Sequence, residues 1–104
     1  MKEVTFEEFP PTWKPEKEGD MVEGRVVEFR TAQIDGKDRR LMVLETNKGG
    51  RRCPMTVWLN GVLEGKVRAG KVTDGVYIRI IYDGKRQSPV SRYQYNVYRL
   101  FRED

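Results

Sequence analysis

The sequence predicts an all-β domain of five strands, with one short helix and an extended N-terminal arm. Five segments rich in β-branched and aromatic residues alternate with turns that contain glycine. A single segment among them carries a helix-capping signal. The chain has 104 residues, which is the size of one domain rather than two.

Turn signals set the boundaries of the predicted strands. Asp35-Gly36 and the run NKGG at 47–50 are sequences typical of tight turns. A glycine inside the first strand, Gly24, indicates a bulge or a sharp bend. A polar loop is expected at 84–91. The strands are expected at 21–30, 40–46, 52–59, 75–83 and 93–102.

A short helical segment is expected at 60–66 (NGVLEGK), between the third and fourth strands. Asn60 is a favourable N-cap, and two glycines keep the segment short. Three strands in a meander, a short helix and a final hairpin follow the order of an OB fold. We therefore expect a five-stranded OB-fold barrel over residues 20–104, preceded by an extended acidic arm at 1–19.

Alternation along the strands predicts which side chains face the barrel interior. In the third strand the apolar set Met55, Val57 and Leu59 should face inward, so Thr56 and Trp58 should face outward. Strand 93–102 has tyrosines in both phases, and its register stays open. In the fourth strand Val76, Ile78 and Ile80 are expected inward, with Tyr77, Arg79 and Ile81 outward. In the second strand Met42 and Leu44 are assigned inward and Leu41 and Val43 outward, but both sets are apolar, so the pattern itself leaves the register open.

The charge of the chain is unevenly distributed. Residues 1–20 contain three lysines and six acidic residues, whereas residues 21–104 contain 17 basic and 10 acidic residues. A basic body favours a polyanionic partner. The acidic arm contains Trp13, whose large ring is expected to dock on the barrel as a plug. The arm is also a candidate to mask the basic face or to dock on a partner protein.

The segment MTVWLNGVLEGK resembles the third strand and following helix of the single-strand-binding OB domains of replication protein A. Trp58 matches an aromatic that stacks on a base in that family, and Tyr93 or Tyr95 matches a second stacking position. Through TWKPEKEGDMVEGRVVEF, LETNKGG, VWLN and YDGKRQSP, residues 12–102 also resemble small uncharacterised OB proteins of phages and prophages. The chain departs from replication protein A in its short length, its acidic arm and its lack of zinc-binding cysteines.

The resemblance implies binding of single-stranded DNA, or of RNA, with a replication or repair protein as a further partner. Single-strand binding needs aromatic faces for the bases and cations for the phosphates. OB folds place these groups on strands two and three and on the loops after strands one and four. The candidate nucleic-acid-binding residues are Trp58, Thr56, Arg30, Lys37, Arg39, Arg40, Arg51, Arg52, Arg79, Lys85, Arg86, Arg92, Tyr93 and Tyr95.

The same residues also have structural interpretations. Trp58 is equally compatible with packing under the arm. Arg51 and Arg52 are compatible with a solvated hairpin tip, and Tyr93 and Tyr95 with packing at a strand edge. An OB fold does not fix function, so a protein–protein interaction module is the alternative.

Enzymatic activity is not expected. The chain has no histidine, the commonest general base and metal ligand. The run GKVRAGK at 65–71 has the spacing of a phosphate-binding loop, but Val72 follows it where serine or threonine is required. Cys53 is the only cysteine, so no cofactor, metal site or internal disulfide is expected. A reducing, cytoplasmic location without a membrane partner fits this composition.

Overall fold

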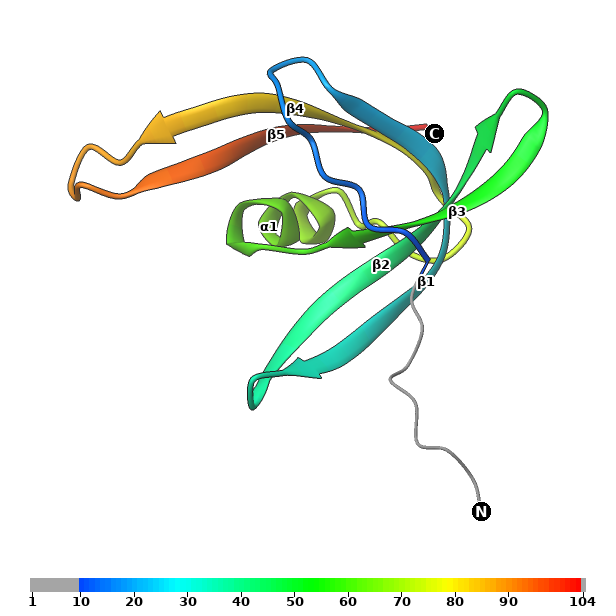
Figure 1. Ribbon diagram of the computed structural model, residues 1–104, viewed down its shortest axis with the longest axis horizontal. Coiled ribbons are helices and arrows are strands. Elements are labelled where there is room, and N and C mark those ends of the chain that lie inside the picture. Colours follow the sequence, from blue (N-terminus) through cyan, green and yellow to red (C-terminus); the bar gives the residue numbers. More distant parts are fainter. Residues whose placement is uncertain (1–9, 104) are drawn as a thin grey trace.

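The computed structural model describes residues 10–103, which form one five-stranded antiparallel sheet and one helix (Figure 1). Residues 1–9 of the predicted arm lie outside the described residues. The strand number, the antiparallel pairing and the helix between the third and fourth strands are as predicted. The elements are β1 (Met21–Ile34), β2 (Lys37–Lys48), β3 (Arg51–Trp58), α1 (Gly61–Ala69), β4 (Tyr77–Gln87) and β5 (Gln94–Arg102).

The sheet is not closed into the expected barrel. Its strand order is β3-β2-β1-β4-β5, which leaves β3 and β5 as two separate edges. The arm pairs with the edge of β3 instead: Trp13 N donates to the Thr56 carbonyl at 2.8 Å, and Thr56 N donates to the Pro11 carbonyl at 2.8 Å. Because the arm uses these backbone groups of β3, they are not available for pairing with β5.

Strand β1 joins the two halves of the sheet. It pairs with β4 along its first five residues and with β2 from Arg25 onward. At the preceding residue, Gly24, an added Cβ would lie 2.5 Å from the backbone oxygen of Glu45, so this close crossing requires glycine. The bulge expected at Gly24 lies instead between Val26 and Glu28.

Two hairpin turns form at the predicted positions, and the third hairpin is longer than expected. Asp35 and Gly36 have φ values of 52° and 75°, which place both turn residues in the left-handed region. The turn after β2 falls at 49–50, within the predicted NKGG run. Strand β4 continues to Gln87, so much of the polar loop expected at 84–91 is strand. Figure 1 shows the β4–β5 hairpin projecting beyond the helix.

Helix α1 begins at the predicted cap. Asn60 Oδ1 accepts a hydrogen bond from Leu63 N at 2.9 Å, which satisfies one of the free donors of the first turn. The helix continues to Ala69 and buries Leu63 and Val67. The GKVRAGK run therefore forms the second half of α1 and the turn that follows it. No helix within residues 10–103 is long and apolar enough to cross a membrane.

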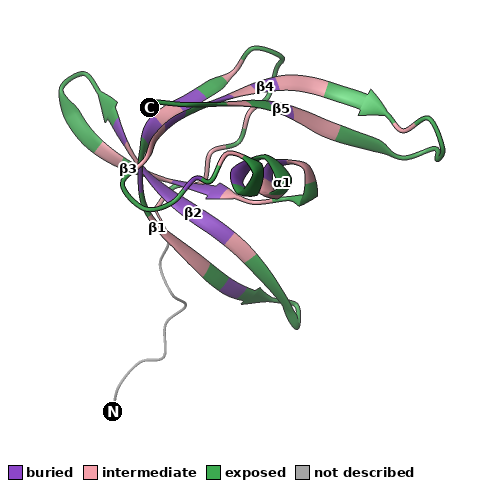
Figure 2. Cartoon of the chain, turned by 180° about the vertical axis from the view of Figure 1, so that it is seen from behind, coloured by how far each residue is buried: buried purple, intermediate pink, exposed green. Residues whose placement is uncertain are grey.

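The apolar side chains form a main core and a smaller second cluster. The inward sets predicted for β2, β3 and β4 belong to the main core, together with Leu63 and Val67. Strand β5 contributes Tyr98 and Leu100, which settles the open register of that strand. Trp13 docks on this core as expected, with its ring centroid 6.0 Å from that of Tyr98. Figure 2 shows burial concentrated where the strands cross, with exposed hairpin ends.

The second cluster lies on the other face of β1 and β2. It contains Ala32, Leu41 and Val43, and Trp58 packs against it. Leu41 and Val43 therefore face away from the main core as predicted, but they are buried rather than exposed. The outer face of β1–β2–β3 is thus partly an apolar packing surface.

Candidate functional site

The predicted nucleic-acid-binding residues are distributed over four regions of the sheet. One group lies along the β1–β2 hairpin and β3, with Arg40 on the core-facing side of β2, a second lies at the β2–β3 tip, and a third on the β4–β5 hairpin. Arg79 lies apart from these groups. The groups are Arg30, Lys37, Arg39, Arg40, Thr56 and Trp58; Arg51 and Arg52; and Lys85, Arg86, Arg92, Tyr93 and Tyr95.

Contacts with the arm limit what two of these residues can offer a ligand. Thr56 is fully buried, and its hydroxyl donates to the Pro10 carbonyl at 2.8 Å. Trp58 is half-buried, and its indole Nε1 donates to Thr12 Oγ1 at 3.3 Å. The indole ring is therefore partly covered by the arm. A ring fully available for stacking on a base would have to be exposed on the outer face. Part of its surface still lines a hollow that it shares with Arg39.

Four of the predicted arginines are paired with carboxylates. Exposed pairs of this kind contribute little to stability, but each one cancels local positive charge. Arg40 also lies over the Phe29 ring, with its guanidinium carbon 4.6 Å from the ring centroid, so it has a packing role. The pairs are Arg30–Glu28, Arg40–Glu64, Arg52–Glu45 and Arg79–Glu23.

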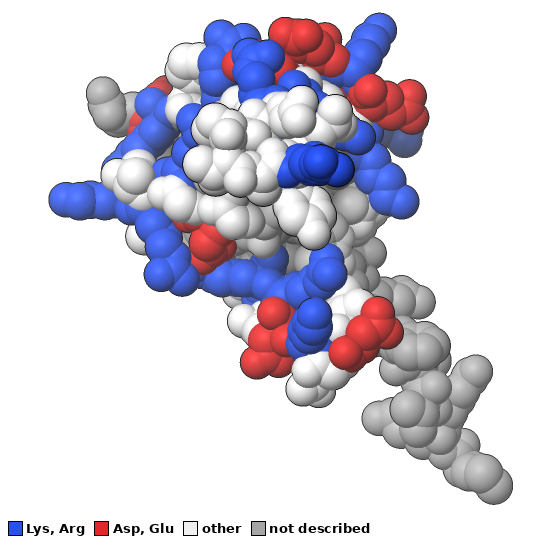
Figure 3. Space-filling model, turned by 90° about the vertical axis from the view of Figure 1, so that its left-hand side faces the viewer, with Lys and Arg blue, Asp and Glu red and all other residues white. Residues whose placement is uncertain are grey.

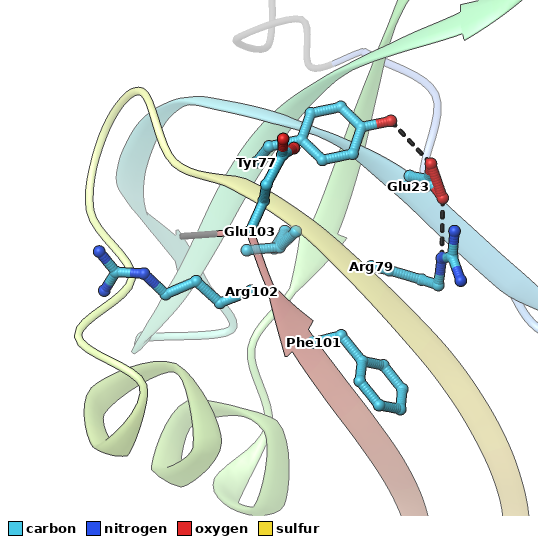
Figure 4. Close-up of a pocket in the computed structure, with 7 residues that line it drawn as sticks. Glu23, Tyr77, Arg79, Phe101, Arg102 and Glu103 are labelled. Atoms are coloured by element: carbon cyan, nitrogen blue, oxygen red, sulfur yellow. Dashed lines mark hydrogen bonds and ion pairs between the residues drawn. The ribbon is translucent and has the colours of Figure 1, made fainter.

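Arg79 lines a separate hollow of about 330 Å³ formed by β1, β4 and the end of β5 (Figure 4). Glu23 accepts hydrogen bonds there from Arg79 Nε and from the Tyr77 hydroxyl, both at 2.8 Å. These bonds, with Arg79 the stronger influence, lower the pKa of Glu23 below its ordinary value. The same bond to Glu23 raises the pKa of Tyr77. Phe101, 48% exposed, lies beside this neutral network.

Six predicted cations have no ion-pair partner among residues 10–103. Only Arg51 lies at the β2–β3 tip. The others lie on the β1–β2 and β4–β5 hairpins, whose tips point to the same side of the molecule with α1 between them (Figure 1). Figure 3 shows this end, where Lys and Arg lie around a largely uncharged middle and carboxylates lie among them, most of them toward the upper and lower margins. The six are Lys37, Arg39, Arg51, Lys85, Arg86 and Arg92.

Two hollows connect these hairpins to the start of α1. The larger, of about 480 Å³, lies between the first residues of the helix and the β4–β5 hairpin, and includes Lys85 and Tyr95. The smaller, of about 270 Å³, includes Trp58 and Arg39. Asn60 lines both hollows, so the four predicted residues follow one path across the molecule.

Asn60 was predicted only as a helix cap, and its place between the hollows depends on packing between distant segments.

The two tyrosines of the β4–β5 hairpin are exposed. Tyr95 is 42% exposed and Tyr93 81% exposed, so neither tyrosine packs in the core. Arg86 lies directly opposite Tyr95 in the β4–β5 ladder, which places a cation beside an aromatic ring on one face of the hairpin. Such a pair has the two groups that a nucleotide contacts, a stacking face and a phosphate partner.

Within the described part of the chain, no group of three or more His, Cys, Asp or Glu residues is placed to bind a metal ion. Cys53 is half-buried and carries a free thiol. No protein-family model, curated protein or solved structure matches this chain. Its function is therefore inferred from the geometry and charge of the site itself.

Proposed function

We propose that this chain is a non-enzymatic nucleic-acid-binding protein whose ligand is a single strand, DNA in the first place and RNA as the second class. One observation carries the proposal. The cations of the β1–β2 and β4–β5 hairpins that have no ion-pair partner among residues 10–103 lie at the end of the molecule that also presents Tyr93, Tyr95 and part of Trp58 (Figure 1). Aromatic faces can stack on bases that are not already stacked in a duplex, which favours single strands.

The strand order supports this proposal because it is compatible with an OB-type fold. We infer that the open sheet is an OB-type fold in which the arm replaces the closing contact between β3 and β5. OB folds are partly open five-stranded barrels that bind oligonucleotides on strands 2 and 3 and on the loops after strands 1 and 4. The equivalent parts here are the outer face of β2–β3 and the two hairpins that carry the unpaired cations.

Fluorescence anisotropy with a labelled oligo-dT tests the proposal. Phosphate contacts release counterions, so the logarithm of the binding constant should fall with the logarithm of salt concentration by about 0.7 for each phosphate neutralised. The five unpaired hairpin cations, Lys37, Arg39, Lys85, Arg86 and Arg92, can neutralise at most five phosphates. The expected slope is therefore at most about 3.5. Absence of binding by the wild-type chain at low salt would refute the proposal.

Two charge-matched double variants locate the site. Arg86→Glu/Arg92→Glu should weaken oligo-dT binding by at least about tenfold, which corresponds to about 1.4 kcal/mol. Arg51→Glu/Arg52→Glu removes the same charge at the β2–β3 tip, and should weaken binding by less than about threefold through the change in net charge alone. Equal losses in the two variants would show that the β4–β5 hairpin is not the site.

A protein-interaction module is the second candidate, and the outer face of β1, β4 and β5 favours it. Met21 is 50% exposed and Phe101 48% exposed there, while Arg79 and Arg99 are neutralised by Glu23 and Asp83. A neutral surface with exposed apolar groups suits a protein partner better than a polyanion. An NMR titration with oligo-dT separates the two functions, because only nucleic-acid binding predicts amide shift changes at the β4–β5 hairpin.

A further inference from the structure

The β4–β5 hairpin ends in an exposed apolar tip. Ser88 N donates to the Tyr93 carbonyl at 3.0 Å, which closes the hairpin around the four residues 89–92. Val90 is 93% exposed, and Pro89 beside it is also exposed. A single exposed valine needs no explanation. Here, however, it lies at the end of a two-stranded projection, next to a tyrosine ring that is 81% exposed.

Cations lie on β4 and in the loop of the hairpin near this tip. At the base of the hairpin, Arg99 Nε is paired with Asp83 Oδ2 at 3.1 Å. Closer to the tip, Arg86 on the β4 side and Arg92 on the β5 side have no ion-pair partner among residues 10–103. The tip therefore combines an apolar end with two arginines, Arg86 before it in the chain and Arg92 after it, neither of which is ion-paired within residues 10–103.

We propose that this tip is a wedge that enters the base stack at a junction between double-stranded and single-stranded nucleic acid. The inference rests on the proposed function and adds a substrate class to it. Proteins that open or bend duplexes insert apolar side chains, proline among them, between base steps. Val90 and Pro89 supply such an end, and Tyr93 supplies a face for the displaced base.

The two flanking arginines explain why a junction fits this tip. A duplex end presents two phosphate backbones on either side of its last base pair, so cations on both sides of a wedge can contact both strands. Unstacking costs least at a position that is already next to single-stranded bases. A lipid surface fits less well, because one valine and one proline bury little apolar area and stable membrane attachment takes two strong signals.

A forked DNA with 2-aminopurine at its last base pair tests the wedge, since the fluorescence of this base rises when it is unstacked. The wild-type chain should raise the fluorescence at the fork at least twofold and leave 2-aminopurine in the middle of the duplex unchanged. Pro89→Ser/Val90→Ser should abolish the rise while retaining oligo-dT affinity within about fivefold, because neither residue belongs to the proposed single-strand site. Val27→Ser, which changes a valine that is 47% exposed on β1, is the matched control and should behave as wild type.

The outcomes separate the wedge from the proposed function. If the wild-type chain binds oligo-dT but leaves the fork fluorescence unchanged, or if the double variant keeps the rise, the wedge is wrong and single-strand binding stands. If oligo-dT is not bound at all, both proposals fail. Val90-dependent binding to phosphatidylserine vesicles without a response at the fork would assign the tip to membranes instead. Unchanged melting temperatures of the variants confirm that the fold is intact, as expected for exposed tip residues.

Discussion

Replacing Gly24 with alanine tests the crossing of β1 on which the arrangement of the two hairpins depends. The new Cβ would lie 2.5 Å from the Glu45 oxygen, 3.0 Å from its carbonyl carbon and 3.3 Å from Thr46 Cα. The closest of these contacts is about 1 Å short of van der Waals separation. All three are backbone atoms of β2 that are held by pairing with β1 or β3, so relief cannot come from rotation of a side chain. Overpacking of this kind costs about 1–3 kcal/mol.

The expected result is a lower melting temperature for Gly24→Ala, by roughly 4–8 °C for each kcal/mol in a domain of this size. Gly65→Ala is the matched control, because its added Cβ meets nothing within 4 Å in the middle of α1. That variant should be more stable than wild type by about 0.5–1 kcal/mol, from helix propensity. Circular dichroism melts of the three proteins measure both effects. A melting temperature for Gly24→Ala at or above that of wild type would show that β1 does not cross β2 this closely.

Three further predictions concern the site and its surroundings. Trp58→Ala should lower the free energy of unfolding, measured by urea titration, by about 1.5–2.5 kcal/mol, because the ring is half-buried and a fully buried ring costs about twice as much. The variant should also weaken oligo-dT binding. An unchanged free energy of unfolding would mean that the ring does not pack on the second cluster. Asn60→Ala should cost about 1 kcal/mol through loss of the helix cap, whereas Asn60→Asp should retain the cap and most of the stability. Glu23 has its pKa lowered from 4.5 in the folded state, so its stabilising contribution is complete above that value and is lost as the pH falls through the lowered pKa. Glu23→Gln should therefore lose less stability than wild type as the pH falls below 4.5, and an identical pH dependence would contradict the hydrogen bonds from Arg79 and Tyr77.

The sequence predicts local features well because they depend on neighbouring residues. The Asp35-Gly36 turn, the Asn60 cap and the inward set Met55, Val57 and Leu59 all follow from short-range geometry. Strand ends were predicted too short, since β4 runs through Gly84 and onward to Gln87. A glycine is an ambiguous signal, because it is found both in turns and within bulged strands.

Non-local contacts explain what the sequence does not predict. Closure of the barrel depends on which segment pairs with the edge of β3. The side chains of β3 alternate in the same way whether that segment is β5 or the arm, so the sequence pattern does not distinguish the two. Burial of Leu41 and Val43 likewise depends on Trp58 from another strand. Arg79 and its partner Glu23 are 56 positions apart in the sequence, so their pairing cannot be read from spacing.

The distribution of acidic residues explains why the β4–β5 hairpin is the more decisive part of the proposed site. Residues 84–102 contain five basic residues and no acidic one, so after Asp83 the hairpin has no carboxylate of its own to neutralise its cations. Strands β1–β2–β3 differ, because Glu28 pairs with Arg30 on the same strand and Glu45 of β2 pairs with Arg52 of β3. Part of the Trp58 ring surface is moreover buried against the second cluster. A change at Trp58 therefore alters stability and binding together, whereas charge reversal at the exposed hairpin alters binding alone, and the charge-reversal experiment is the sharper test of polyanion binding.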